Sequence, residues 1–358
     1  MTADILTFVL GQPERLKRLS LADWDLLIRQ ARRAQLLARL ERICAGRGWL
    51  ADIPPGPHRH LEAARYHCER QHCEVRWEVD RIRSALASVE TPIVLLKGAA
   101  YVVAGLPPAS GRLFADIDIM VPRGRLAEVE TALGARGWVT QAQDSYDQRY
   151  YRTWMHELPP LRHVTRGTML DVHHTITPPT SRAAVDADKL FAAARPIDAG
   201  QNLLVLSPVD MVLHSAAHLF QEGEFDHGLR DLVDFDDLLR DFGRDLAFWP
   251  SLADRAAELG LGRPLYYAMQ HARRILSTSV PGEFAAALDR YRPGPLAGRA
   301  MAASLRIALK PDHPACNGYF TPLARGFLYL RAHYLRMPLN LLVPHLVRKA
   351  LISDRVQT

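Results

Sequence analysis

The chain has 358 residues, of which 48% are hydrophobic and 23% are charged, and its formal net charge is +6. These values are ordinary for a soluble globular protein, and the length allows two or three domains with large cores. The chain has no run of 18 apolar residues, no signal-peptide pattern at its start and no zinc-ligand spacing among its four cysteines. We therefore expect a cytoplasmic protein with reduced thiols and no transmembrane segment.

Residues 1–90 are predicted to form an N-terminal helical region. The pattern over residues 13–47 is typical of two amphipathic helices, with residues 20–24, beginning at Ser20, as an N-cap region. A proline-rich linker follows at residues 51–57. The alternation of polar and apolar residues over 58–89 then indicates one long helix.

A possible phosphate-binding turn follows this region. Residues 93–96 form a continuous apolar run that indicates a buried strand, and the run stops at Lys97-Gly98, before a segment typical of a helix. Glycine lets a phosphate approach the backbone, a helix N-terminus offers free N–H groups, and lysine adds a positive charge. The alternative is an ordinary strand-to-helix turn, and the chain lacks the Walker pattern.

Two aspartates lie close together in the next predicted strand, which ends at Val121-Pro122. Because residues i and i+2 of a strand point to the same face, Asp116 and Asp118 are expected to project together. Adjacent carboxylates repel unless a cation lies between them, and a hard divalent ion such as Mg²⁺ prefers oxygen ligands. The pair therefore favours metal-assisted phosphoryl chemistry over the alternative of two solvated acids on an edge strand.

A third acid, Asp171, lies in a later alternating segment over residues 168–176, where His173 shares its face. Between the two acidic strands we expect a helix over residues 123–136, a strand from 137 and a proline bend at 158–161. Asp171 could complete a metal cluster or act as a general base, and the alternative is a strand-end acid paired with arginine. His173 could lie near the nucleotide or the acceptor, or be structural.

After a short helix over residues 186–194, the chain is predicted to be helical from Pro208 to about residue 350. His214 and His218 have a spacing that can bind zinc, but a structural pair is favoured. In the acidic, amphipathic stretch 229–240, Asp231 and Asp234 could line a groove that faces the active site, but solvation is favoured, with Asp234 as the expected exception. The aromatic and basic tail 325–349 could contact a membrane or nucleic acid, but prolines interrupt it and packing against the core is favoured.

The three central segments together resemble the polymerase β-like nucleotidyltransferase superfamily, in which a glycine turn opens a helix, Asp-x-Asp follows on the next strand and a third acid comes later. Three motifs are similar to those of a bacterial group described as uncharacterised nucleotidyltransferases. They are Leu96-Lys97-Gly98, the Arg-x-x-x-Asp-Ile-Asp run at residues 112–118 and the helical stretch 24–31. The catalytic resemblance covers residues 91–176, and a looser one spans roughly 15–240.

The resemblance implies roles for individual residues. It makes Asp116, Asp118 and Asp171 the catalytic, metal-binding acids, with the last as ligand or base. It also implies a set of nucleotide-binding residues: Lys97, Gly98, Ala99, Arg112 and His173. Where the superfamily commonly has Gly-Ser or Gly-Gly, this chain has Gly98-Ala99, so a serine hydroxyl is absent from the turn while the backbone N–H groups remain.

We therefore expect an α+β protein with a small mixed-sheet nucleotidyltransferase core at residues 91–200, flanked by helical regions at 1–90 and 201–358. The expected activity moves a nucleoside monophosphate from an NTP, with ATP favoured, to an acceptor hydroxyl or phosphate, using Mg²⁺ or Mn²⁺. A small molecule, a peptide or a protein is favoured as acceptor over RNA, because no aromatic-interleaved basic motif for single strands is present. The alternative is a catalytically silent nucleotide-binding or interaction module on the same fold.

Overall fold

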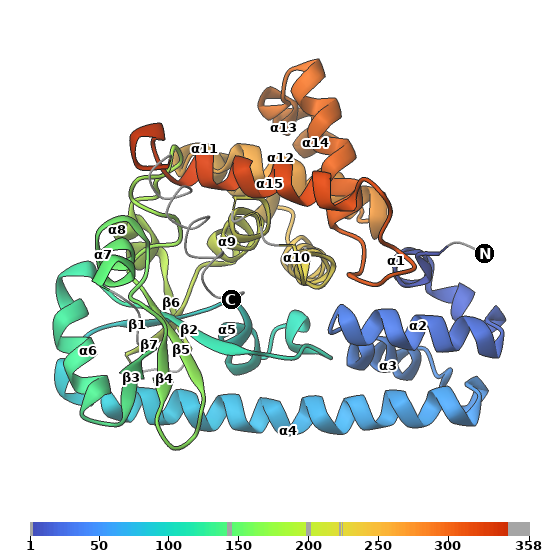
Figure 1. Ribbon diagram of the computed structural model, residues 1–358, viewed down its shortest axis with the longest axis horizontal. Helices are drawn as coiled ribbons and strands as arrows, with labels where there is room; N and C mark the ends of the chain where they lie inside the picture. The colour runs from blue at the N-terminus through green and yellow to red at the C-terminus, as the bar shows by residue number, and fades with distance from the viewer. Residues whose placement is uncertain (1–2, 142–144, 198–201, 222, 224, 343–358) are drawn as a thin grey trace, which may run out of the picture.

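The computed structural model describes residues 3–141, 145–197, 202–221, 223 and 225–342 (Figure 1). The α-helices of this part of the chain are α1 (Ile5–Gly11), α2 (Leu21–Arg33), α3 (Leu37–Gly46), α4 (Pro55–Ala85), α5 (Lys97–Val103), α6 (Leu126–Gly134), α7 (Ser145–Trp154), α8 (Ala187–Ala193), α9 (Pro208–Gln221), α10 (Gly228–Phe242), α11 (Phe248–Glu258), α12 (Gly262–Ile275), α13 (Gly282–Leu288), α14 (Pro295–Ala308) and α15 (Thr321–Arg336). The strands are β1 (Ile93–Leu96), β2 (Asp116–Met120), β3 (Trp138–Thr140), β4 (Leu161–His163), β5 (Met169–His173), β6 (Arg195–Pro196) and β7 (Leu203–Val205).

The strands form one mixed sheet with the order β3-β4-β5-β2-β1-β7-β6. β1 runs antiparallel to β2 and parallel to β7, while β2 runs parallel to β5. All four residues of β1 are buried, as expected for a continuous apolar run at the centre of a sheet. The predicted α+β class, with a mixed sheet flanked by helices, is confirmed.

The N-terminal helices form a platform that reaches the sheet through α4. Figure 1 shows this helix running along one side of the molecule, from α2 and α3 at one end to the sheet at the other. Ser20 caps α2 as predicted: its hydroxyl accepts from the backbone N–H of Asp23, and the Asp23 carboxylate accepts from the backbone N–H of Ser20. The long helix begins inside the predicted linker, at Pro55, and ends at Ala85.

The C-terminal helices cover the side of the sheet and of α5 that lies away from α4 (Figure 1). The sheet itself continues to Val205, because β7 pairs with β1 beyond the expected boundary at residue 200. A single cluster of buried apolar side chains runs through the N-terminal helices, the sheet and the C-terminal helices up to α15. The three regions expected from the sequence thus share one core.

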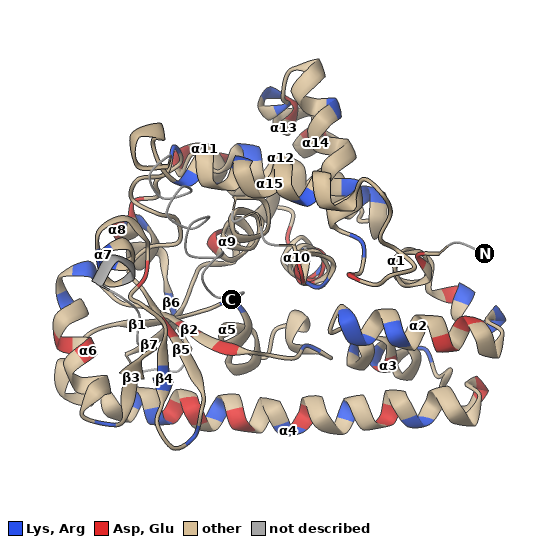
Figure 2. Cartoon of the chain, in the orientation of Figure 1, with Lys and Arg blue, Asp and Glu red and all other residues tan. Residues whose placement is uncertain are grey.

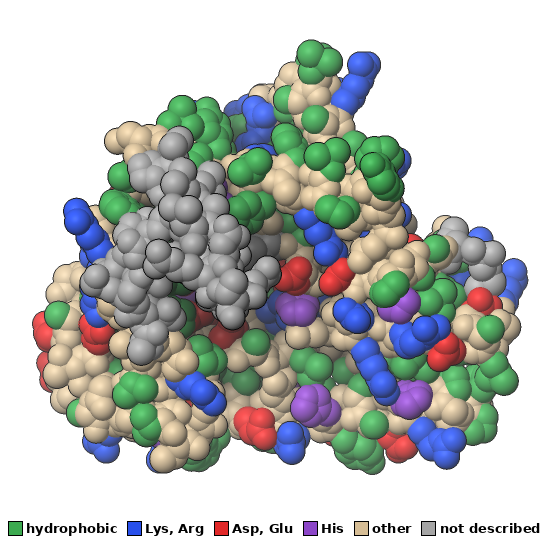
Figure 3. Space-filling model, viewed as in Figure 1, with side chains coloured by type: hydrophobic (Ala, Val, Ile, Leu, Met, Phe, Trp, Pro, Cys, Tyr) green, Lys and Arg blue, Asp and Glu red, His purple; other side chains and the backbone are tan. Residues whose placement is uncertain are grey.

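Helix α15 packs on the molecule with one face and leaves the other in solvent. Ala324, Leu328 and Ala332 are buried, while Leu323 and Leu330 are exposed. Figure 3 shows hydrophobic side chains gathered over this helix. The predicted packing of the tail against the core is therefore confirmed for the helix α15. Residues 343–349 of the predicted tail lie outside the described residues. In the part of the chain that the structure covers, none of the helices has the length and apolar character needed to cross a membrane.

Candidate active site

The three predicted catalytic acids lie on one face of the central sheet because of the register between β2 and β5. The two strands are parallel, and Asp118 lies opposite Asp171. Asp116 precedes Asp118 by two residues and therefore shares its face. The next aligned pair on this face is Met120 and His173. Asp118 is buried, Asp171 is half-buried and Asp116 is exposed at the first position of its strand.

Lys97 brings a positive charge to these acids from the end of β1. Its Nζ lies 3.2 Å from Oδ1 of Asp118. Its backbone has φ of +43°, in the left-handed region that residues other than glycine and asparagine rarely adopt. The strand β1 thus turns abruptly into α5 at this residue, and such strain is maintained only where surrounding contacts hold it.

His173 contacts the same carboxylate from β5. Its Nε2 lies 3.0 Å from Oδ1 of Asp118 and 3.4 Å from Oε2 of Glu157, and the ring is buried. Burial raises the pKa of Asp118, but the Lys97 ammonium and the His173 hydrogen bond outweigh it and hold this pKa well below its usual range. Asp118 is therefore ionised at neutral pH although it is buried.

Asp116 shows the opposite behaviour. The residue as a whole is exposed, but the protein around its carboxyl group and the negative charge of Asp118 both raise its pKa, and burial is the larger cause. Lys97 and Arg112 offset only part of this. The pKa values of two neighbouring acids on one strand are thus shifted in opposite directions, which is a common property of catalytic carboxylates.

Gly98 is required for the close approach of α5 to the segment before β2. A Cβ atom at this position would lie 2.3 Å from Cδ1 of Phe114 and 3.3 Å from Nε of Arg112. Ala99, the second residue of the predicted phosphate-binding turn, is buried. The glycine therefore has a packing reason to be present, in addition to the role predicted from the sequence.

Arg112 lies in a mostly buried ionic network with α10. It forms an ion pair with Asp234, and its Nη1 lies 3.8 Å from Oδ1 of Asp231. Its guanidinium also lies over the rings of Tyr101 and Phe114, at 5.7 and 5.5 Å from their centres. Burial lowers the pKa of Arg112 to about 10. Figure 2 shows acidic positions on β2 and on α10.

This ionic network tests the expectation that the acids of stretch 229–240 are solvated. Asp234 is only 2% exposed, so the exception expected for this residue is confirmed. Solvation is wrong for Asp231, whose side chain is largely covered and whose Oδ1 accepts from Nη2 of Arg230 at 2.9 Å. Both acids are turned inward because α10 lies over buried arginines that need counter-ions.

Two histidines of α9 approach the same site, which the sequence did not reveal. His214 is buried, and its pKa is lowered well below the ordinary value by burial and by the nearby Lys97 cation. His218, one helical turn later, is among the groups that depress the pKa of Asp118. The four-residue spacing was the available signal, but it could not show that α9 brings both histidines near Asp118.

His173 also belongs to a second group of ligand atoms, whose other two residues, His156 and Glu157, the sequence did not single out. Among the described residues, the atoms of His156, Glu157 and His173 lie within 4.8 Å of one another, a spacing that could hold a metal ion. The three aspartates share a face without being gathered this closely in the described residues. Their donor set still fits a hard divalent cation, since all are carboxylates and the Lys97 and His173 contacts of Asp118 both involve Oδ1.

A family model described as an uncharacterised nucleotidyltransferase matches residues 20–277, from α2 to just beyond α12. The match covers the sheet, the acids, α9 and α10, and it confirms the resemblance drawn from the sequence. No curated protein and no solved structure shows significant similarity to the chain.

Proposed function

The chain belongs to this family of uncharacterised nucleotidyltransferases, and we propose that it transfers a nucleoside monophosphate from ATP or another NTP to an acceptor hydroxyl or phosphate. The family match supports nucleotidyl transfer as the general activity. The observation that best supports the finer proposal is the register of β2 and β5, with Asp116, Asp118 and Asp171 on one face and Lys97 against Asp118.

Asp116, Asp118 and Asp171 would hold Mg²⁺ or Mn²⁺. Bound metal in such a site neutralises charge on the triphosphate and on the attacking oxygen. Asp118 suits this role because it is ionised when buried. Asp116 suits it because burial and, second, the negative charge of Asp118 raise its pKa, and a bound divalent cation would offset both by stabilising the ionised carboxylate.

Binding of the triphosphate would use the start of α5. The Lys97 ammonium would contact the outer phosphates, and the backbone N–H groups of Gly98 and Ala99 would supplement it. His173, held between Asp118 and Glu157, would contact the nucleotide or orient Asp118. Arg112 already has two carboxylates as partners, so its proposed role is to hold Phe114 and the glycine turn in position.

In the transfer step, an oxygen of the acceptor bonds to the α-phosphorus while the bond from that phosphorus to its bridging oxygen breaks, and pyrophosphate leaves. The acceptor proton would pass to Asp171, which lies one strand away from the other two acids. Asp171→Asn is therefore expected to lower kcat by roughly 10²-fold or more, with a much smaller change in NTP affinity. Normal turnover in this variant would contradict the assignment.

The experiment that tests the proposal uses α-³²P-labelled NTPs with Mg²⁺ and candidate acceptors, namely small hydroxylated or phosphorylated metabolites, peptides and proteins. Wild-type protein should produce a labelled acceptor and pyrophosphate, and Asp118→Asn should produce neither. The alternative, a silent binding module, would give NTP binding of equal affinity in Mg²⁺ and in EDTA and no pyrophosphate with any acceptor.

A further inference from the structure

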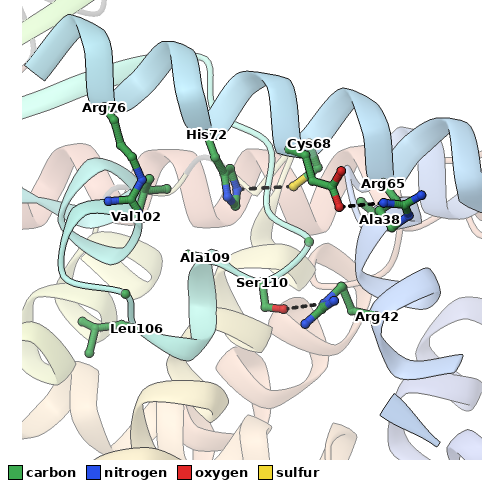
Figure 4. Close-up of a pocket in the computed structure, with 13 residues that line it drawn as sticks. Ala38, Arg42, Arg65, Cys68, His72, Arg76, Val102, Leu106, Ala109 and Ser110 are labelled. Carbon is green, nitrogen blue, oxygen red and sulfur yellow. Dashed lines mark hydrogen bonds and ion pairs between the residues drawn. The ribbon is translucent and has the colours of Figure 1, made fainter. Parts of the chain in front are cut away.

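A separate pocket of about 270 Å³ lies between α4, α3 and the end of α5. Figure 4 shows its two sides: Arg76, His72 and Cys68 extend from α4 toward Val102, Leu106 and Ala109 on the opposite wall. None of the three catalytic aspartates lines this pocket, and neither does Lys97. It is therefore distinct from the candidate active site, although the Gly111 that borders it directly precedes Arg112.

The pocket carries more positive than negative charge. Its arginines are Arg42, Arg65 and Arg76, and its one acid is Glu69. Nη1 of Arg65 lies 2.8 Å from Oε1 of Glu69, and its Nε lies 3.7 Å from Oε1 of the buried Glu41, so Arg65 has two acidic partners. Arg42 donates from Nε to the neutral hydroxyl of Ser110 at 2.9 Å (Figure 4). Among the described residues, no carboxylate forms an ion pair with Arg42 or Arg76, which leaves two positive charges at the rim.

The cysteine and histidine of the pocket are neutral and structural. Burial raises the pKa of the Cys68 thiol to about 11, and burial lowers the pKa of His72. Sγ of Cys68 and Nε2 of His72 lie 3.3 and 3.2 Å from the carbonyl oxygen of Arg112. They therefore hold the backbone beside the pocket, and the pair does not supply a thiolate nucleophile. The charge of the pocket is therefore set by its arginines and their acidic partners, and not by the cysteine or the histidine.

The wall opposite α4 is apolar and backbone-lined. Val102, Leu106 and Ala109 form most of it, together with Gly105 and Gly111. Gly111 has φ of +82°, and a Cβ there would lie 2.7 Å from the backbone N and Cα of Arg39. The wall is therefore held close against α3. The pocket volume of about 270 Å³ leaves room for a small apolar group beside the charged rim.

We propose that this pocket binds a phosphomonoester of a small, partly apolar molecule. A phosphomonoester carries close to two negative charges at neutral pH, so it would pair strongly with either Arg42 or Arg76, which lie at opposite ends of the pocket in Figure 4. Arginine binds phosphate through paired N–H groups, and the apolar wall would take the organic part of the ligand. The proposal does not depend on nucleotidyl transfer, since the pocket shares no side chain with the acids.

The test uses calorimetry of the full chain with phenyl phosphate, benzoate and inorganic phosphate as probes, at constant ionic strength. Phenyl phosphate should bind at least tenfold more tightly than benzoate, and more tightly than inorganic phosphate. The double variant Arg42→Gln/Arg76→Gln should weaken phenyl phosphate binding at least about tenfold, since each lost charged contact contributes strongly. A charge-matched control, Arg70→Gln/Arg83→Gln on exposed positions of α4, should bind as wild type.

The variant Lys97→Asn separates this pocket from the active site. Unchanged phenyl phosphate binding in Lys97→Asn, together with loss in the double arginine variant, supports the proposal. Loss in Lys97→Asn with retention in the double arginine variant would assign the anion to the active site and overturn it. Benzoate affinity equal to that of phenyl phosphate, or no phenyl phosphate binding by the wild type, would also overturn it.

Discussion

The ion pair between Arg112 and Asp234 gives the strongest prediction about stability, because it joins the C-terminal helices to the segment before β2. The Arg112 side chain is 10% exposed and that of Asp234 is 3% exposed. Removal of one partner from a buried pair leaves an uncompensated charge and typically costs about 3–5 kcal/mol. In Asp234→Ala, Asp231 stays 3.8 Å from the guanidinium, so we expect the lower end, about 3 kcal/mol.

The assay is urea unfolding followed by tryptophan fluorescence, with the loss read from the shift in midpoint at unchanged slope. The control is Asp25→Ala, which removes the exposed partner of Arg29 and should cost less than about 1 kcal/mol. Replacing both partners, as in Arg112→Met/Asp234→Leu, should recover most of the loss because no unpaired charge remains. A cost for Asp234→Ala as small as that of the control would refute the assignment of this pair as buried.

Other predictions concern the active-site face. At pH 7, Asp116→Asn should raise and Asp118→Asn should lower the urea midpoint, because the folded-state pKa of the first acid is raised and that of the second is depressed. The gain in stability from Asp116→Asn should fade as pH falls toward the ordinary pKa of a carboxyl group. The stability that ionised Asp118 contributes should be lost only as pH falls below that value. Shifts of the urea midpoint with equal sign in the two variants at pH 7 would contradict this reasoning. Gly98→Ala should destabilise by about 1–3 kcal/mol through its clash with Phe114, while Gly134→Ala, which meets no atom within 4 Å, should not. Lys97→Asn keeps a residue that tolerates positive φ and removes the charge, so it should preserve folding and weaken ATP binding more than AMP binding in calorimetry; equal losses would place Lys97 away from the outer phosphates.

Much of the candidate site followed from local sequence chemistry. The apolar run at residues 93–96 ends where lysine and glycine change the backbone direction, and the structure has a strand followed directly by a helix there. The period-two alternation around Asp116 and Asp118 showed which residues share a face. It could not show that β2 and β5 are neighbours with Asp118 opposite Asp171, since pairing between strands about 50 residues apart depends on the whole sheet.

The features that the sequence missed depend on long-range packing. His214 and Asp231 lie on helices whose own patterns indicate only amphipathic segments, and their positions near Lys97 and Arg112 come from the way α9 and α10 cover the sheet. Glu157 lies in an irregular segment after α7, and neither this helix nor β4 was expected. The segment's single bridge to His173 brings Glu157 to the site. No local periodicity marks such a contact.

The most direct test of the central claim is calorimetric ATP binding to the full chain with Mg²⁺ and with EDTA, repeated in Asp118→Asn. We expect clear binding by the wild type in Mg²⁺, little binding in EDTA, and loss of the Mg²⁺-dependent part in Asp118→Asn, because this buried, ionised acid would hold the metal that bridges to the triphosphate. Equal ATP affinity in Mg²⁺ and EDTA, unchanged by Asp118→Asn, would contradict the claim that these aspartates form a metal-dependent nucleotidyl-transfer site.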